Sequence, residues 1–363
     1  MNWLYIFLGF SLLILLHEGG HYVAAKATGM RVERFFLFFG PTIWSFRRGE
    51  TEYGVKAIPL GGYVKITGMN PEEEVPPEAE HRSYYRQPVW KRVVVVAAGP
   101  AVNIVLAFAI LFFVFFTGAQ QTSQSVGEVR EGSPAVGVLQ PGDRILAVDG
   151  RSFADRDRIE RLEGFGKQVA SHECAGRQVE GCRAATPVQL RFSRDGEVRT
   201  VTVYPKYDEQ AKRALIGFSY GAEDRELSVG GAATESLDKI WLVTEKTASI
   251  FSRLFEAEQR KEISGIVGVS AVGNETLDIG VYPSLILLAL VSLSLGLVNL
   301  LPILPLDGGH IFWAVVEKLR GRPASLRVME RATVIGFGLV LLLMFIGLNN
   351  DIGRLSDGGF DVR

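Results

Sequence analysis

The chain has 363 residues, 47% of them apolar, and its mean hydropathy is +0.18. The formal net charge is −1, which excludes the strongly basic surface that nucleic-acid binding needs, so no nucleic-acid partner is expected. The apolar residues are gathered in a few long runs instead of being spread evenly. This distribution is typical of a membrane protein and not of soluble domains.

Four uncharged or nearly uncharged stretches approach the roughly 20 residues that a helix needs to cross a bilayer. The first covers residues 1–16 and continues as an apolar run to residue 25, across His17 and Glu18. The others are 93–127, with its core at 93–116, then 279–306 and 332–350. The first stretch has no Lys or Arg before it and no small-residue cleavage pattern after it, so we expect a retained helix and not a signal peptide. The sequence thus predicts four transmembrane helices.

The basic residues predict how these helices are oriented. The loop between the first two spans holds eleven Lys and Arg, and the loop between the last two is also basic. Basic loops stay in the cytoplasm, which places both termini and the long 119–278 segment on the outer side.

Residues 31–69 have the pattern of strands joined by turns. A turn is expected at 48–50, and Gly61 and Gly62 interrupt the last strand, which together predict a small cytoplasmic β-hairpin region. Two roles are open for it. The hairpin could only pack against the spans, or its edge could pair with an extended substrate segment.

Residues 119–226 are expected to form one inserted α+β domain. Strands are predicted near 126–129, 144–148, 188–192 and 198–203, and the run 140–150 resembles PDZ domains of bacterial proteases, which bind peptides by strand addition. A rigid spacer or size filter is the alternative. Residues 227–278 follow as a connector, whose apolar spacing over 229–258 predicts an amphipathic helix, lying on the outer membrane surface or under the PDZ-like domain.

Cys174 and Cys182 are the only cysteines, and they bracket a seven-residue insertion in the predicted domain. In an oxidising compartment a disulfide there would contribute about 2–3 kcal/mol. A zinc site is the weaker interpretation, because two cysteines cannot complete a tetrahedral shell, although His172 is nearby.

His17 and His21 are four residues apart, so on a helix both project from nearly the same face and can reach one zinc ion. Glu18 lies beside them, where a carboxylate can act as the base of a metalloprotease. Three polar groups are costly in an apolar helix and usually mark function there. We therefore expect one Zn²⁺ per chain.

A catalytic zinc takes a third protein ligand, for which Asp307 is the best candidate. It follows the third apolar stretch directly, where Pro302 and Pro305 prevent a regular helix. Alone, Asp307 would be read as the N-cap of a helix that starts at 308. Together with the histidines, ligation is favoured, and His310 is interpreted as a neighbouring or simply buried group.

The chain resembles the site-2 protease family, in particular the bacterial regulator of sigma-E protease type with an extracytoplasmic PDZ domain. The resemblance covers nearly the whole chain and rests on four motifs: His17-Glu18-x-x-His21, Gly99-Pro100-x-x-Asn103, Asn299-x-x-Pro302-x-x-x-Leu306-Asp307-Gly308 and Pro59-Leu60-Gly61-Gly62-Tyr63-Val64-Lys65. It implies that His17, His21 and Asp307 bind zinc and that Glu18 is the base. It further implies that Asn299 helps to hold the substrate and that Asn103, with Gly99, shapes the second span against the active site. Independently, a strand edge near Gly61 and Gly62 could hold an unwound substrate segment by backbone pairing, so the candidate substrate-binding residues are Asn299, Gly61, Gly62 and Asn103. Some relatives carry two PDZ domains in tandem, and 119–226 has room for one.

The expected fold is a polytopic α-helical membrane protein: helices 1 and 2 with the β-region in 1–118, the PDZ-like domain in 119–226, the connector in 227–278, and helices 3 and 4 in 279–363. The resemblance implies a multi-pass protein of the bacterial inner membrane. It would cleave single-span membrane proteins already trimmed by another protease, such as anti-sigma factors, or leftover signal peptides. Sixteen uncharged residues before His17 place the zinc toward the cytoplasmic side of the bilayer. The alternatives are a zinc-free membrane scaffold that gathers partners through its PDZ-like domain and, more remotely, an ion transporter.

Overall fold

The computed structural model describes residues 2–69, 73–118, 120–152, 158–209, 211–224, 227–253, 256, 260 and 263–356. The chain divides into two compact units, one made of residues 1–117 and 227–363 and the other of residues 118–226. The first unit contains all of the predicted spans.

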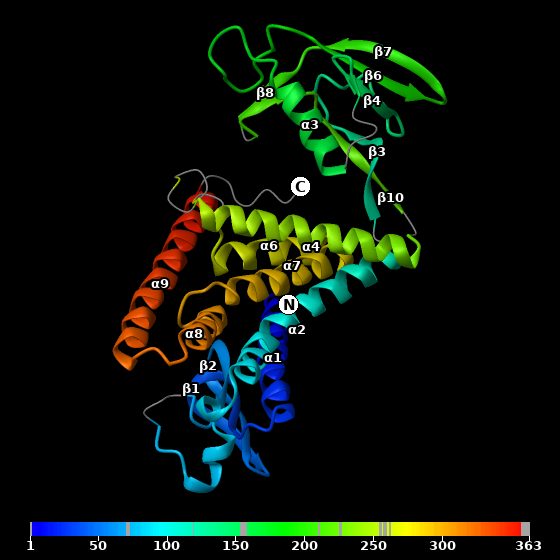
Figure 1. Ribbon diagram of the computed structural model, residues 1–363. Coiled ribbons are helices and arrows are strands. Elements are labelled where there is room, and N and C mark those ends of the chain that lie inside the picture. The colour runs from blue at the N-terminus through cyan, green and yellow to red at the C-terminus, as the bar shows by residue number, and fades with distance from the viewer. Residues whose placement is uncertain are drawn as a thin grey trace. The chain divides into compact units, whose positions relative to one another are not determined.

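Four helices in the described part of the chain are long and apolar enough to cross a membrane (Figure 1), as the sequence predicts. They are α1 (Asn2–Ala27), α2 (Val89–Phe116), α7 (Val281–Asn299) and α9 (Leu326–Ser356). The prediction for the third span needs one change. The uncharged stretch runs to residue 306, but α7 ends at Asn299, and residues 300–306 form turns before a new helix begins.

Small residues bring α1, α2 and α7 close together. A Cβ on Gly20 of α1 would lie 2.6 Å from the Ala98 carbonyl oxygen of α2, and one on Gly296 of α7 would lie 3.0 Å from the Pro100 oxygen. Ser292 of α7 also donates a hydrogen bond of 2.9 Å to the Asn103 carbonyl in α2. Helices in a membrane pack closely where small residues let the backbones approach, so these contacts fix the three helices in one register.

The described residues of this unit include further α-helices besides the four spans. They are α4 (Val229–Ser252), α6 (Ile266–Ile279) and α8 (Asp307–Arg320). Helix α4 packs against α2 and α7, and α8 packs against α2. The predicted amphipathic helix 229–258 corresponds to α4, and its residues 254, 255 and 257–258 lie outside the described residues.

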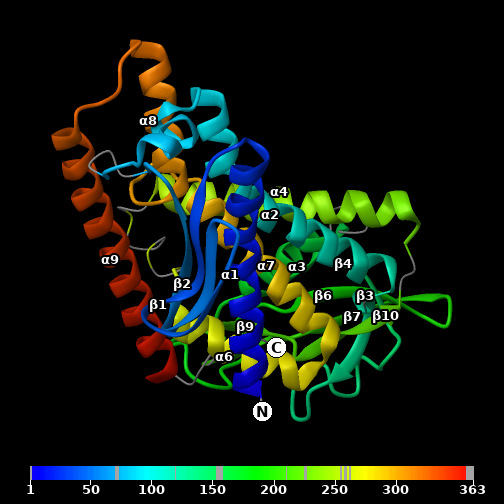
Figure 2. The same cartoon turned by 90° about the horizontal axis from the view of Figure 1, so that it is seen from below.

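The predicted hairpin consists of β1 (Val32–Arg48) and β2 (Thr51–Ile66), joined by a turn at 49–50 and lying beside α1 (Figure 2). Both strands bend back on themselves. Residues 34–39 pair on one side with 52–58 and on the other with 62–65, and residues 42–48 pair with 51–56. The order across the sheet is therefore 42–48, 51–58, 32–39 and 62–66, so the segment 62–66 is an edge.

The sheet is attached to the ends of α1 and α2 by a small apolar core and by one cluster of ion pairs. The core includes Ala25, Met30, Val32, Ile66, Tyr84, Val95 and Val96. In the cluster, the Glu50 carboxylate accepts from Lys26 at 2.5 Å and from two nitrogens of Arg82 at 2.7 and 2.8 Å. Arg82 ends the short helix η1 (Pro77–Arg82), which η2 (Tyr84–Arg86) follows. Glu50 thus joins the hairpin turn to α1 and to η1.

The unit 118–226 is an α+β domain with its own core. Its main sheet has the order β10–β3–β4–β6–β7, with β5 paired to β4, and β8 pairs with β9. The elements are β3 (Gln120–Val129), β4 (Arg144–Val148), β5 (Arg151–Ser152), α3 (Arg158–Ala170), β6 (Val188–Arg194), β7 (Glu197–Val203), β8 (Lys206–Asp208), β9 (Arg213–Leu215) and β10 (Phe218–Asp224). Phe192, Leu190 and Val148 are among the buried residues that fill the core.

The insertion in this domain is closed by a covalent bond. Cys174 and Cys182 form a disulfide. His172 does not join them. Its Nε2 lies 2.9 Å from Asp149 Oδ2 and its Nδ1 lies 2.8 Å from Thr186 Oγ1. Both ring nitrogens of His172 are therefore engaged away from the sulfur atoms.

The Glu50 cluster gives a pH-dependent prediction for stability. Hydrogen bonds from Arg82, supported by Lys26, lower the pKa of the Glu50 carboxyl from 4.5 to about 2. A depressed carboxyl pKa contributes stability above the unfolded-state pKa, and that contribution is lost as the pH falls through the folded-state value. We expect Glu50→Gln to lower the melting temperature of the detergent-solubilised protein by a few degrees at pH 7, and this deficit should shrink between pH 4.5 and 2.

Glu52→Gln is the matched control for this experiment, because the Glu52 carboxylate has one long ion pair, 3.6 Å from Arg34, and accepts one hydrogen bond from Ser45. It should change the melting temperature less at pH 7. A Glu50→Gln deficit that stays constant down to pH 2 would contradict the proposed linkage.

Candidate metal centre

The two histidines of the motif lie on one face of α1 and are both buried. Their Nε2 atoms are 3.3 Å apart. Each is also close to one carboxylate oxygen from the far end of the sequence: Asp307 Oδ2 lies 3.2 Å from His17 Nε2 and 3.3 Å from His21 Nε2. The structure therefore brings together the three residues that the sequence predicts as zinc ligands.

This triangle has the dimensions of a zinc site. Two ligand atoms that each lie about 2.0–2.1 Å from one ion, at a tetrahedral angle, are about 3.3 Å from each other. The three separations of 3.2–3.3 Å match this value. Asp307 Oδ2 is moreover buried without a hydrogen bond of acceptable geometry, although it lies between two imidazoles. A bound cation would satisfy this oxygen and both nitrogens at once, so the residues present fit zinc.

A backbone carbonyl on α2 orients His21. The His21 Nδ1 lies 2.9 Å from the Val95 carbonyl oxygen. Because that oxygen can only accept, Nδ1 carries the ring proton and donates a hydrogen bond to it. The lone pair of Nε2 then faces the other two ligands, as metal binding requires. The sequence gives no signal for Val95, because any residue type supplies the same carbonyl.

Asn103 on α2 contacts the other histidine. Its side chain is fully buried, with the amide nitrogen 3.3 Å from His17 Nδ1 and Oδ1 without a partner. Exchanging the two amide atoms by a 180° rotation brings Oδ1 to His17 Nδ1 and lets the imidazole donate to it. That orientation leaves His17 Nε2 free to bind a metal. Asn103 is thus placed against a ligand, in agreement with a role in shaping α2 around the site.

Asp307 is the first residue of α8, and its side chain does not cap that helix. The N-cap position is Leu306, with no side-chain hydrogen bond to the helix end. The N-cap interpretation that the sequence left open is therefore wrong, because the carboxylate turns toward the histidines instead. Tight packing behind it makes the turn possible: a Cβ on Gly308 would lie 2.1 Å from the Leu300 oxygen.

Glu18, Gly62 and Asn299 line one cavity of about 270 Å³ with the three predicted ligands, whereas the fully buried Asn103 does not line it. A Cβ on Gly62 would lie 2.9 Å from Glu18 Cγ, so the edge segment of the sheet touches the side chain of the predicted base. Asn299 lines the cavity from the end of α7, and its side-chain amide donates a hydrogen bond of 3.0 Å to the Leu295 carbonyl oxygen. His310 lines it too, outside the three-atom cluster. Gly61 is not among the lining residues and has a φ of +111°, which suits glycine.

Gly99 provides a test of the metal centre. A Cβ at this position would lie 2.3 Å from His21 Nε2, so Gly99→Ala should displace the ring and lower zinc affinity by about 10- to 100-fold, as other disturbances of metal-ligand orientation do. Zinc per chain, measured by elemental analysis after dialysis against graded chelator, reports the loss. Gly19→Ala is the matched control within the motif, because nothing lies within 4 Å of its Cβ. Equal zinc retention in the two variants would show that the packing of Gly99 does not hold the ligand.

Comparison with known proteins agrees with this geometry. Residues 5–343 match Peptidase family M50. The chain is 33% identical to "Zinc metalloprotease Rip1" of Mycolicibacterium smegmatis, over 90% of this chain and 89% of that one. It is 30% identical to "Zinc metalloprotease Rip1" of Mycobacterium tuberculosis, over 95% and 94%. A PDZ domain of an SdrC-like protein from Listeria monocytogenes is 18% identical, covers 28% of this chain and 88% of its own, and has a TM-score of 0.21, on which no conclusion rests. The chain belongs to Peptidase family M50, the site-2 protease family, and is a multi-pass membrane zinc metalloprotease.

Proposed function

We propose that this protease hydrolyses peptide bonds within or next to transmembrane segments of other membrane proteins. The observation that carries the proposal is the position of the chemistry: His17, Glu18 and His21 lie inside α1, a helix long and apolar enough to cross a membrane. A soluble or extended substrate has no need of a site at that place. A transmembrane segment meets the site without leaving the bilayer.

His17, His21 and Asp307 would hold one Zn²⁺, and Glu18 would act as the base. Bound zinc supplies Lewis-acid polarisation of the scissile carbonyl and lowers the pKa of a water molecule. Glu18 accepts a proton from the attacking water and passes it to the leaving amine nitrogen. Val95 and Asn103 hold the two imidazoles in the orientation that ligation needs.

A transmembrane substrate hides its carbonyl groups in helical hydrogen bonds, so it must unwind before cleavage. The edge segment 62–66 offers a strand to which an unwound segment can add. Gly62, Tyr63, Val64 and Ile66 line the same cavity as Glu18, so a strand added there would pass the metal ligands. Gly61 gives the bend that starts this segment, and Asn299 would contact the substrate from the opposite wall.

The proposed orientation follows the basic loops. The hairpin region and the α8–α9 loop face the cytoplasm, the metal centre lies toward that side of the bilayer, and the unit 118–226 is extracytoplasmic in a bacterial inner membrane. There its disulfide would persist, since that side is oxidising. We assign this unit as PDZ-like, and it would screen substrates by binding peptides or by excluding large domains. The substrates would be single-span membrane proteins already trimmed by another protease, such as anti-sigma factors, or remnant signal peptides.

Two substitutions separate the base from a metal ligand. Glu18→Gln should retain zinc and lower cleavage by about 10²- to 10⁴-fold, the usual contribution of a general base. Asp307→Asn should lower cleavage and zinc content together. The measurement is co-expression with candidate membrane substrates, followed by gel analysis, with elemental zinc on the purified variants. A trimmed substrate should accumulate in both variants. Cleavage by Glu18→Gln at the wild-type rate would overturn the assignment of the base.

Strand addition predicts an alternating dependence on the substrate backbone. Successive amides of a strand point to opposite sides, so only alternate amides can pair with the edge 62–66. In synthetic transmembrane peptides, N-methylation of one set of alternate amides near the scissile bond should reduce kcat/KM by about tenfold or more. Methylation of the other set should have a smaller effect. Equal effects at all positions would argue against pairing at this edge.

A further inference from the structure

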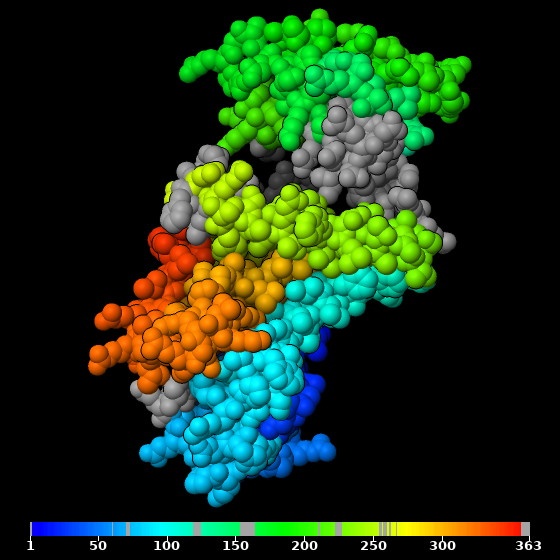
Figure 3. Space-filling model, viewed as in Figure 1, coloured from blue at the N-terminus to red at the C-terminus, as the bar shows by residue number. Residues whose placement is uncertain are grey.

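A second cavity lies next to the metal centre and shares one residue with it. Its volume is about 310 Å³, and its lining comes from η2, the start of α2, α8 and the start of α9. His310 lines both this cavity and the one that holds the metal ligands. Figure 3 shows the α8 surface, drawn in orange, directly against the cyan surface of the chain around residue 90. The catalytic chemistry described above does not use this cavity.

One face of α8 connects the two cavities. Asp307, His310, Ala314 and Glu317 follow the three- and four-residue spacing that places side chains in a row along a helix. The first is a metal ligand, the second lines both cavities, and the last two line only the second. At 1.5 Å per residue, the row from 307 to 317 is about 15 Å long. The second cavity thus begins about one helical turn from the metal ligand.

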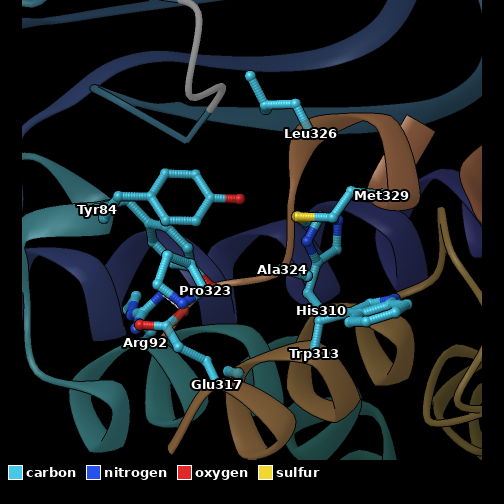
Figure 4. A pocket seen from close by; sticks show the side chains of 11 residues that line it. Tyr84, Arg92, His310, Trp313, Glu317, Pro323, Ala324, Leu326 and Met329 are labelled. Atoms are coloured by element: carbon cyan, nitrogen blue, oxygen red, sulfur yellow. Dashed lines mark hydrogen bonds and ion pairs between the residues drawn. The ribbon is translucent and has the colours of Figure 1, made fainter. Parts of the chain in front are cut away.

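The lining is mostly apolar and aromatic (Figure 4). Tyr84 stands on one side and His310, Trp313 and Met329 on the other, with Leu326 at the top of the view. Tyr84 is 3% exposed, and burial raises the pKa of its hydroxyl, which keeps it neutral. Aromatic rings and a thioether are the groups that bind a large apolar or aromatic side chain best.

The one charged pair in the described lining does not turn the cavity into an ion site. Arg92 donates to both oxygens of Glu317, at 3.0 and 2.5 Å. The two charges neutralise each other, so neither an anion nor a cation is attracted strongly. The pair would not favour a charged side chain, which would have to be buried beside two groups that already satisfy each other.

We propose that this cavity is a substrate subsite that receives one large apolar or aromatic side chain close to the scissile bond. The inference rests on the proposed function and deepens it, since the occupant belongs to the unwound membrane segment held at the metal centre. An extended chain advances about 3.3 Å per residue, so the 5–10 Å between Asp307 and the cavity place this side chain within about three residues of the cleaved bond. The volume suits a single ring and lies at the low end of the range for ligand sites.

Two substitutions of opposite effect test the subsite. Ala314 is 6% exposed in the wall, so Ala314→Leu takes up part of the cavity, whereas Met329→Ala enlarges it. Transmembrane peptides with a mapped cleavage site carry Phe or Ala in turn at each of the three positions on either side of that site. At one position the full-length wild-type enzyme should prefer Phe, measured as the ratio of kcat/KM for Phe over Ala.

Ala314→Leu should lower this ratio at that position by about tenfold, mainly by slowing the Phe peptide, and Met329→Ala should leave it unchanged or raise it. Val315→Leu is the matched control, because Val315 is the next residue of α8, is 44% exposed and does not line the cavity. It should keep the wild-type ratio. The ratios at the other positions should not change in any variant.

Three results would overturn the subsite. They are a wild-type enzyme without preference at any of the six positions, ratios that stay within twofold in both cavity variants, and equal slowing of all peptides. The last would indicate a path for water instead. None of these results would contradict the proposed function. If the proposed function were wrong, wild type and Glu18→Gln would either cleave no transmembrane peptide or cleave it at equal rates.

Discussion

Three buried ligand atoms within 3.3 Å of one another are the constraint on which the rest of this membrane unit depends. Two imidazole nitrogens and a carboxylate oxygen at these separations in a largely apolar environment are well satisfied by a cation that all three can bind. The packing of the surrounding helices makes this arrangement possible. Gly99 leaves room for the His21 ring, Gly20 lets α1 approach α2, and the turns at 300–306 bring Asp307 back to α1.

The same constraint explains why the helices carry so many small or helix-breaking residues near the site. A continuous third span would have carried residue 307 beyond the histidines. The chain instead leaves α7 at Asn299, and α8 begins at Asp307, the proposed third ligand. Non-helical backbone at membrane depth is tolerated only where protein or a wet cavity surrounds it. Here the metal cavity and the packing of Gly308 against the Leu300 oxygen provide that surrounding.

Much of this architecture could be predicted from the sequence, because its signals are local or chemically rare. Long uncharged runs predict the four spans, and a histidine pair inside one of them predicts the ligands. Asp307 could be predicted as the third ligand only because the motif needed one. The structure showed what local patterns do not encode. The two bent strands place residues 32–39 between the two halves of β2, which pairs segments on both sides of one strand. Arg92 and Glu317 form an ion pair although they are 225 positions apart, and the residues around each give no sequence signal for this pairing. Nor could the Val95 carbonyl be predicted as a partner of His21.

The wide separation of the ligands along the chain has a consequence for the cell that makes this protein. Asp307 follows His21 by 286 residues (307 − 21). At about 5–20 residues per second, a ribosome needs roughly 15–60 s to add this length. During that interval the nascent chain contains Glu18 and the two histidines but lacks Asp307, the third member of the proposed metal site. The proposed metal site therefore cannot form until α7 has been inserted and α8 has packed against α2.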